Sequence, residues 1–317
     1  MSRIFRIATR RSKMAMVQTT AIIAALQKVA PEHSYEVYEV VADGDYDKFQ
    51  GDLKRLGIAG GGKGAFVKAL EIALLENRAD MAMHSMKDVP GEVDLPQGLV
   101  IPAMMERQDV RDAVVCRAGE SLATLPPGAR IGSSSVRRAA QMRRAFPQFE
   151  IVPLRGNADT RVAKVDSGEV DAAILSYAGL GRIGLQHRVT DVLEPDLMLP
   201  AVGQGAVGIE CRADDAEALR VLKLINHPDT FACVNTERTM LKLLQGSCHT
   251  PIAGVARCVG DEILFEALVS SLDGSEILHS NAQMPYAEGE KLGAAVARDL
   301  LAKGANRLLN EATKEDE

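Results

Sequence analysis

The sequence predicts an α/β protein in which two similar α/β units are followed by a smaller α+β unit. Strand-like and helix-like segments alternate from the start of the chain, the alternation begins again after Pro102, and the pattern changes after Asp214. The length of 317 residues also exceeds what one hydrophobic core usually organises. We therefore expect two or three domains, with one boundary near Pro102.

The first unit opens with a short strand and a helix. Residues 4–8 are typical of a strand, and apolar residues at three- and four-residue spacing predict a helix from about Ser12, whose hydroxyl can cap it. A second strand is expected at 35–41, a helix at 65–76 and a further strand near 80–83. This order is the β-α-β rhythm of a parallel sheet.

The second unit repeats that rhythm after Pro102. Its expected strands and helices are, in order, the strands 112–115 and 130–131, the helix 136–145, the strand 150–152, the helix 159–166 and the strand 170–175. Ligands of open α/β sheets bind at the carboxyl ends of the strands. Two such units in succession therefore imply a cleft between them.

The third unit has a different order of elements. Two helices come first and three strands follow, and a last helix ends the pattern: 215–226, 230–244, 252–257, 262–270, 276–283 and 288–302. Runs of helices and strands that do not alternate are typical of an α+β unit.

The composition indicates a globular protein that binds no nucleic acid and crosses no membrane. The chain is 46% hydrophobic and 25% charged, and its formal net charge is -6, whereas nucleic-acid binders show a basic excess. No stretch approaches the ~18 apolar residues of a membrane span, and Arg3 and Arg6 stand where a signal peptide needs an apolar run. We expect a cytoplasmic location.

The cysteines predict neither a metal site nor a disulfide framework. They number five, an odd set, and contain no CxxC pair. Thiols of this kind fit a reducing compartment.

Basic residues cluster even though the protein is acidic overall. The clusters consist of arginines: Arg10, Arg11, Arg137, Arg138, Arg143, Arg144, Arg155 and Arg161. In an acidic protein such clusters indicate a local pocket for small anions.

The glycine-rich segment 57–64 almost matches a phosphate-binding P-loop. Gly64 stands where a Ser or Thr would hold Mg²⁺, so nucleotide hydrolysis is not expected. Two alternatives stay open, a flexible linker that leads into the next helix and a flexible lid that carries Lys63.

The segment 84–90 places Lys87 and Asp88 in a loop at the carboxyl end of a buried strand, where ligand sites of α/β proteins lie. An exposed Lys-Asp pair on its own is more often solvated surface. His84 is expected to be a hydrogen-bonded structural residue rather than a base.

Two segments of the second unit join a strand to the start of a helix. In 133–138, hydroxyls and unpaired backbone N–H groups make an anion site beside Arg137 and Arg138. The segment 155–161 repeats this design with arginines at both ends. The alternative is two capped helices with solvated arginines.

Cys248 lies in a short segment that follows a helix, and Gly246 can terminate that helix. A loop cysteine is available for chemistry, although most cysteines are small buried apolar residues. The adjacent His249 invites a cysteine-hydrolase interpretation, but neighbouring residues point apart and no orienting third residue is evident.

Together these motifs resemble the porphobilinogen deaminase family. The resemblance runs from Arg6 to about Ala256 as an ordered series: 7–10 with Ser12, 61–64, 84–90, Ser134 and Ser135 with Arg137 and Arg138, 154–157, 178–180 with Arg182, 200–206 with 210–212, and Cys248 with Pro251. Each motif alone is weak, but the series in order is highly specific.

The resemblance implies a more definite fold. It would comprise two α/β domains like those of type II periplasmic binding proteins, flanking a cleft, and a smaller α+β C-terminal domain. The implied domains are 1–102 with 202–220, then 103–201, then 221–317, which carries the cofactor cysteine. The implied cofactor is a dipyrromethane joined by a thioether to Cys248.

The implied activity is the stepwise condensation of four porphobilinogen molecules into linear hydroxymethylbilane, with loss of ammonia. Each pyrrole brings two carboxylates, which arginine forks match better than lysines do. Asp88 would be catalytic and would also bind the cofactor, together with Lys87, Ser135, Arg137 and Arg138. The implied substrate-binding residues are Arg10, Ser12, Lys63, Arg155, Arg161 and Arg182. We expect a monomer.

Some positions depart from the family pattern without removing a proposed catalytic group. They are Arg11, Lys13, Ala59 and Ser247. Two rival functions stay open, a non-enzymatic anion-binding module and a cysteine hydrolase. The module gives no reason for Cys248 in a separate domain, and the hydrolase needs a reactive thiol in the mature protein.

Overall fold

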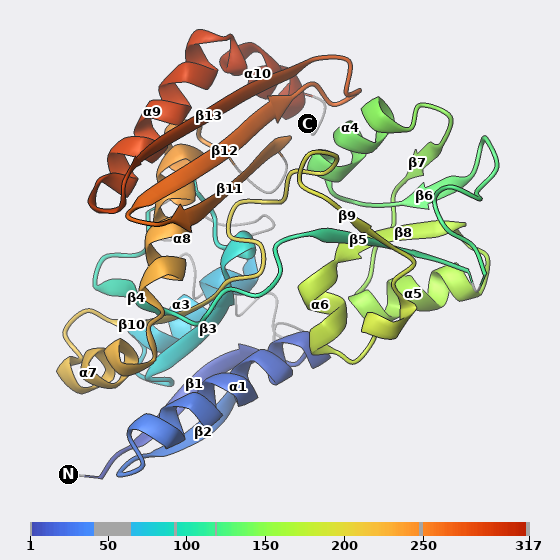
Figure 1. Cartoon of the computed structure of the whole chain (residues 1–317). Helices are drawn as coiled ribbons and strands as arrows, with labels where there is room; N and C mark the ends of the chain where they lie inside the picture. Colours follow the sequence, from blue (N-terminus) through green and yellow to red (C-terminus); the bar gives the residue numbers. More distant parts are fainter. Residues whose placement is uncertain (1, 41–64, 92–93, 118, 247–249, 315–317) are drawn as a thin grey trace. The chain divides into compact units, whose positions relative to one another are not determined.

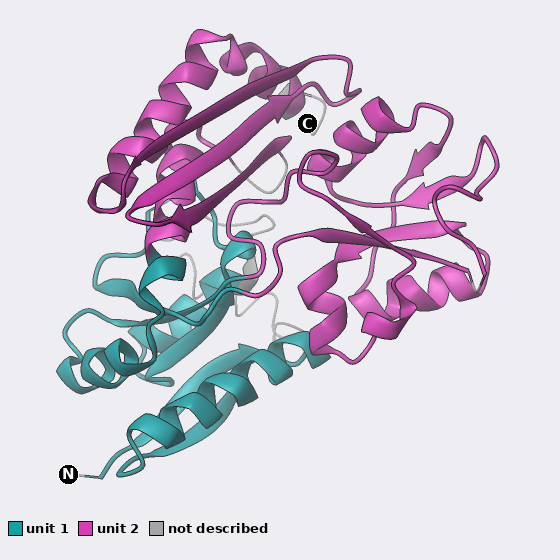
Figure 2. Ribbon diagram, viewed as in Figure 1, with its two compact units in different colours: residues 1–107, 206–231 teal, residues 108–205, 232–317 magenta. Residues whose placement is uncertain are grey.

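The structure is a computed structural model that describes residues 2–40, 65–91, 94–117, 119–246 and 250–314. The chain forms two compact units, shown in different colours in Figure 2. Unit 1 comprises residues 1–107 and 206–231, and unit 2 comprises residues 108–205 and 232–317. Each unit is therefore assembled from two separate stretches of sequence.

Unit 1 is built on a mixed sheet whose described strands run in the order β2-β1-β3-β10-β4 (Figure 1). β1 is parallel to β2 and β3, whereas β10 is antiparallel to β3 and β4. The elements are β1 (Ile4–Arg10), α1 (Lys13–Val29), β2 (Ser34–Val40), α3 (Ala65–Leu75), β3 (Met81–Ser85), the 3₁₀ turn η1 (Met86–Asp88), β4 (Leu99–Met104), β10 (Val207–Arg212) and α7 (Ala216–Ile225).

The first helix of unit 1 begins where the sequence predicts. The Ser12 hydroxyl accepts a hydrogen bond from the Ala15 N–H at 3.3 Å, which satisfies one of the open donors of α1. The inner face of α1 packs Ile22 and Leu26 against Phe5 and Ile7 of β1, all of them fully buried. This apolar layer fixes the helix on one face of the sheet.

Unit 2 contains a second mixed sheet, with described strand order β7-β6-β8-β5-β9. β6 is parallel to both of its neighbours, and β5 is antiparallel to β8 and β9. Its elements are β5 (Asp112–Cys116), β6 (Arg130–Gly132), α4 (Val136–Ala145), β7 (Glu150–Val152), α5 (Ala158–Asp166), β8 (Ala172–Ser176), α6 (Tyr177–Arg182), η2 (Gln186–Arg188) and β9 (Asp191–Leu193).

The rest of unit 2 is an antiparallel sheet, β11-β12-β13 in its described part, covered on one face by helices (Figure 1). Phe265 and Val269 of β12 are fully buried beneath Leu292 and Leu300 of α9. The elements are α8 (Pro228–Leu243), β11 (Ile252–Val259), β12 (Glu262–Ser270), β13 (Ile277–Pro285), η3 (Tyr286–Glu288), α9 (Gly289–Ala302) and α10 (Ala305–Lys314). The first residues of α8, up to Phe231, belong to unit 1. The expected fold class, two α/β sheets and a smaller α+β part, is confirmed.

Most expected elements are present, and the differences have physical reasons. Pro102 was expected at a boundary but lies inside β4, which is the edge strand of the described sheet and so tolerates the missing N–H. The sequence pattern also missed β10, whose glycine and charged residues look unlike a core strand. Unit 1 extends to residue 107, and the three-domain division stays a prediction.

The two connections between the units approach each other closely along the backbone. Gln108 N–H donates to the Gly205 carbonyl at 3.3 Å, and Met105 N–H donates to the Val207 carbonyl at 2.9 Å. Gly205 has φ +85°, and a Cβ there would stand 2.4 Å from the Gln108 carbonyl oxygen. The backbones approach so closely at residue 205 that only glycine fits there.

Candidate functional site

Lys87 and Asp88 lie in the turn η1, directly after the buried strand β3. Met86 holds this turn because its side chain is 1% exposed and packs over Gly208, where a Cβ would collide with its sulfur. The Met86 N–H also donates to the Ala206 carbonyl at 3.1 Å. Lys87 is half-buried and Asp88 is exposed, so the turn presents the carboxylate of Asp88 at the end of the strand.

His84 is structural, as predicted. Its Nε2 lies 2.8 Å from Oε2 of Glu210, and both side chains are buried within the sheet of unit 1. The other oxygen of Glu210 is a buried acceptor without a hydrogen-bond partner among the described residues. This pair ties β10 to the strand that carries Lys87 and Asp88.

Two further predicted residues of unit 1 lie at the end of β1. Arg10 is the last residue of that strand, and its side chain is half-buried. Ser12 caps α1, so its oxygen already accepts one backbone hydrogen bond. Since β1 and β3 are parallel, Arg10 and the Lys87–Asp88 turn lie at the carboxyl ends of adjacent strands.

In unit 2, the helices α4 and α5 begin at the carboxyl ends of the adjacent parallel strands β6 and β7. The Ser134 hydroxyl joins the two connecting loops: it donates to the Leu154 carbonyl at 2.8 Å and accepts from the Leu154 N–H at 3.1 Å. Ser135 caps α4 through the N–H of Arg138. The predicted segments 133–138 and 155–161 are thus brought together.

Arg137 and Arg138 are buried and both bind Asp112, the first residue of β5. Arg137 donates to Asp112 Oδ2 at 2.7 Å, and Arg138 donates to Oδ1 at 2.6 Å. Gln204 adds a third donor to Oδ1 at 2.9 Å. Burial alone would raise the pKa of Asp112, but the two guanidiniums outweigh it and hold that pKa well below its usual range.

One buried hydrogen-bond donor of this network has no acceptor among the described residues. Nε of Arg137 has no hydrogen-bond partner within the described part of the chain, and burial lowers the pKa of this arginine despite the adjacent Asp112. A forked contact of either arginine to a ligand carboxylate stays a prediction, because their strongest present contacts are to Asp112.

Arg155, Arg161 and Arg182 differ from that pair, since none has a carboxylate partner among the residues that the structure describes. Arg161 donates to the Gly156 carbonyl at 2.8 Å, and Arg182 donates to Gln108 Oε1 at 2.7 Å and to the Gly205 carbonyl at 2.8 Å. The guanidiniums of Arg161 and Arg182 are therefore held by neutral oxygens, whereas Arg155 is exposed.

Electrostatics makes this region of unit 2 attractive to anions. Burial, and then the nearby Arg138, lower the pKa of Arg161. Burial lowers the pKa of Arg182 to about 10. A cation that is partly removed from water without a counter-ion is stabilised by any anion that binds beside it. These residues fit a group that carries carboxylates.

Lys63 and Cys248 lie outside the described residues. The elements on either side of Cys248 in the sequence are described, namely α8 and β11. α8 ends as predicted at a glycine, because the Gly246 N–H donates to the Leu241 carbonyl at 2.9 Å. The left-handed residue of this cap, however, is Gln245 with φ 52°.

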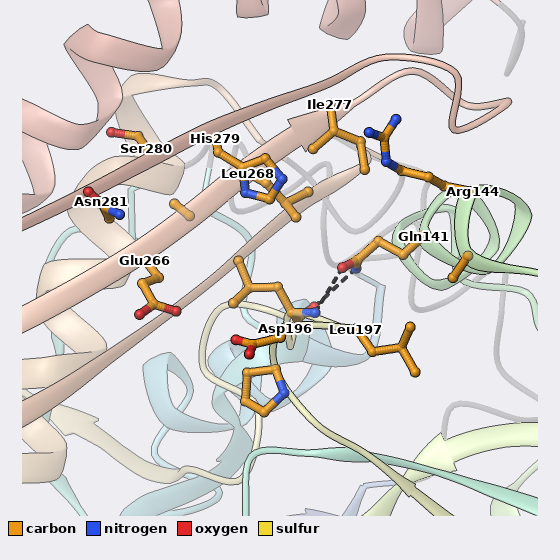
Figure 3. A pocket seen from close by; sticks show the side chains of 14 residues that line it. Gln141, Arg144, Asp196, Leu197, Glu266, Leu268, Ile277, His279, Ser280 and Asn281 are labelled. Atoms are coloured by element: carbon orange, nitrogen blue, oxygen red, sulfur yellow. Dashed lines mark hydrogen bonds between the residues drawn. The ribbon is translucent and has the colours of Figure 1, made fainter.

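Unit 2 also has a pocket of about 500 Å³ between α4, the segment 195–199 and the sheet strands β12 and β13 (Figure 3). Arg144 lies on one wall, Asp196 and Glu266 on others, so both charge signs are present. The Gln141 amide is engaged with the backbone of Leu199. Of the basic clusters named from the sequence, Arg144 lines this pocket, whereas none of the described residues predicted to bind cofactor or substrate does so.

Sequence reasoning missed two residues that organise the site, Asp112 and Gln204. Asp112 begins the apolar run of β5, and a carboxylate ahead of a fully buried strand is a signal that a buried cation faces it. Gln204 stands between two glycines and offered no comparable signal.

The fold and this cluster define an α/β protein with a cationic site at the ends of its strands. A family model described as "Porphobilinogen deaminase, dipyromethane cofactor binding domain" matches residues 5–220, and "Porphobilinogen deaminase, C-terminal domain" matches residues 231–302. Porphobilinogen deaminase of Syntrophobacter fumaroxidans is 43% identical over 98% of both chains. That of Methylobacillus flagellatus is 44% identical over 96% of both.

The chain belongs to the porphobilinogen deaminase family, and it is an enzyme of the transferase class with a dipyrromethane-cofactor domain. Solved structures similar to it include the methionine-binding protein MetQ, with TM-score 0.42, 12% identity and coverage of 72% of this chain and 92% of that one. A periplasmic substrate-binding protein from Coxiella burnetii gives TM-score 0.43 at 12% identity, covering 74% and 96%. No helix of the described residues is long and apolar enough to span a membrane.

Proposed function

We propose that this protein is a hydroxymethylbilane synthase, which condenses four porphobilinogen molecules into linear hydroxymethylbilane and releases ammonia, a step of tetrapyrrole biosynthesis. The observation that carries the proposal is the set of partly buried arginines without carboxylate partners in the described chain, in a protein related to porphobilinogen deaminases over nearly its full length. A poly-carboxylate substrate supplies the missing anions.

The arginines bind and orient the substrate. Arg155, Arg161 and Arg182 would each meet a carboxylate of a bound pyrrole, and Arg10, Ser12 and Lys63 would complete substrate binding. A forked guanidinium fixes the plane of the carboxylate it binds, so the pyrrole is held in orientation as well as in place. Asp112 keeps Arg137 and Arg138 in position beside this region.

Asp88 carries the catalytic role in this proposal. Loss of ammonia from the aminomethyl group of porphobilinogen leaves a cationic azafulvene. A carboxylate beside the pyrrole nitrogens stabilises the developing positive charge and can accept a proton there. The support is the position of Asp88, exposed at the end of β3 on a turn that Met86 fixes.

The cofactor would be joined through a thioether to Cys248 and held by Lys87, Asp88, Ser135, Arg137 and Arg138. When bound, it supplies the pyrrole on which the chain is built. The Nε of Arg137, a buried donor without a described partner, fits an acidic group of this kind. The monomeric state, the cytoplasmic location and the three-domain division also stay predictions.

The attachment is tested by the intact mass of the purified protein. We expect an excess of two pyrrole units over the sequence mass, located on the peptide that contains Cys248 and absent from Cys248→Ser. Cys116→Ser is the control that should keep the adduct. An active protein at its bare sequence mass would refute the attachment.

The role of Asp88 is tested by turnover. Asp88→Asn keeps the shape and removes the charge, so it should lower kcat by on the order of 10²-fold or more, as loss of other preorganised electrostatic groups does. Asp88→Glu should retain more activity. Near-normal turnover of Asp88→Asn would show that Asp88 is a solvated surface residue without a catalytic role.

A further inference from the structure

Two cysteine sulfurs of unit 2 lie in contact. Sγ of Cys233 on α8 and Sγ of Cys258 on β11 are 3.5 Å apart, which is longer than the ~2.05 Å of a disulfide bond. Cys233 is 4% exposed, whereas Cys258 is half-buried at the margin of the same apolar cluster. The pair is therefore a dithiol with one member that a reagent can reach.

The two cysteines of this pair lie on either side of Cys248 in the sequence. α8 ends at Leu243 and β11 begins at Ile252, so the two cysteines stand on the elements that precede and follow the segment containing Cys248. They are 25 residues apart in sequence. A covalent bond between them would join both flanks of that segment.

We propose that Cys233 and Cys258 form an oxidisable dithiol site whose co-reactant is a low-molecular-weight disulfide. The Cys258 thiolate attacks one sulfur of the reagent, forms a mixed disulfide and expels one thiolate. The deprotonated Cys233 then attacks Cys258 Sγ and expels the second thiolate. The protein loses two electrons and two protons, and the reagent disulfide is reduced to two thiols.

The geometry accounts for this order and for the selectivity. Cys258 reacts first because it is the accessible member, and Cys233 follows because its sulfur is already in contact. The sulfurs need to approach by only about 1.5 Å to reach bonding distance. Cys116 and Cys211 are buried, and burial raises the pKa of both thiols, in Cys211 to about 12. They should stay reduced.

The crosslink should stabilise the C-terminal part of unit 2, because it closes a long loop of the unfolded chain. Any effect of the crosslink on the cofactor at Cys248 rests on the proposed function, whereas formation of the crosslink itself does not. The mass of the Cys248 peptide and the mass of the Cys233–Cys258 peptide pair therefore test the two proposals separately.

The experiment treats the purified holoenzyme with oxidised glutathione and maps its peptides. We expect the Cys233 and Cys258 peptides to be joined, the protein to lose two hydrogens in mass, and the midpoint of thermal unfolding to rise by several degrees and fall again after dithiothreitol. Cys116→Ser should behave as the wild type.

Two variants keep the result interpretable. Cys258→Ser should gain neither the crosslink nor the thermal shift, and Cys233→Ala should stop at a glutathione adduct on Cys258. Should the wild type also stop at that adduct, or keep both thiols under conditions that modify an exposed cysteine peptide, the dithiol site would be refuted.

Discussion

Unit 2 holds two sets of arginines that the sequence presents alike and the structure treats differently. Arg137 and Arg138 are buried and share the carboxylate of Asp112, whereas Arg161 and Arg182 are partly buried and contact only neutral oxygens of the described chain. The first set already has its counter-ion. The second set lacks one.

The difference predicts that Arg137 and Arg138 stabilise the fold in addition to any role in binding, whereas Arg161 and Arg182 stabilise it less. A buried ion pair keeps its shape because removing either partner leaves an uncompensated charge. A partly buried cation held by carbonyl and amide oxygens gains most when an anion arrives. The ligand-binding role of Arg161 and Arg182 stays a prediction, and the placement of Arg137 and Arg138 depends on Asp112.

The largest effect is expected for Asp112→Asn. It removes the counter-ion of two buried guanidiniums and should lower the free energy of unfolding by about 3–5 kcal/mol. Urea denaturation measures this. The control is Asp166→Asn, because Asp166 pairs with Arg188 at 2.6 Å on an exposed surface and should cost less than about 1 kcal/mol. Equal losses in the two variants would contradict the distinction.

Glu71 of unit 1 tests the same principle with the opposite charge. Burial, and then the nearby Glu210, raise the pKa of Glu71 to about 7 from 4.5, although His84 and Lys68 oppose the shift. As pH rises, Glu71 ionises first in the unfolded chain, while the folded protein still holds its proton. The free energy of unfolding therefore falls between pH 4.5 and 7. That loss is about 3 kcal/mol.

Glu71→Gln should therefore lose less stability than the wild type between pH 5 and pH 8, by roughly 2–3 kcal/mol. Urea denaturation at the two pH values measures the difference. Glu36→Gln on the outer part of β2 is the control, since Glu36 is exposed. A variant with the same pH dependence as the wild type would show that Glu71 is ionised in the folded protein.

Arg161→Leu and Arg182→Leu should affect function more than stability. Each lost arginine–carboxylate contact should cost roughly 1.5–3 kcal/mol, which is about ten- to hundredfold in affinity or rate. An arginine that holds incoming substrate should slow every addition, and one that holds the extended chain should let early enzyme intermediates accumulate. Arg155→Leu extends the series. If all three leucine variants kept the turnover and the distribution of enzyme intermediates of the wild type, these arginines would not bind substrate carboxylates.

The smallest effect is stabilisation by a simple anion. Citrate, a tricarboxylate, should raise the free energy of unfolding of the wild type by RT ln(1 + [L]/Kd), and with it the unfolding midpoint, and it should do so less in Arg161→Leu. Sodium chloride at equal ionic strength is the control for screening. Identical shifts in both proteins would place citrate elsewhere on the surface.

The sequence was enough to predict most strands and helices that carry the site, because apolar spacing, the Ser12 cap and the Ser135 cap are local signals. It did not predict α6, which carries Arg182. It could not distinguish Arg138 from Arg161. That distinction depends on Asp112, which is distant in sequence and meets Arg138 only through packing of α4 against β5. The placement of β10 between β3 and β4 is equally non-local.

That placement has a consequence for synthesis of the chain. β10 begins at Val207, so the sheet of unit 1 lacks the strand that joins β3 to β4 until more than half of the protein has been made. The sheet of unit 2 formed by β5 to β9 is encoded entirely within that interval. On a ribosome the middle of the chain can thus fold before its beginning, and a nascent chain stopped short of residue 207 exposes the unpaired edges of β3 and β4 to aggregation.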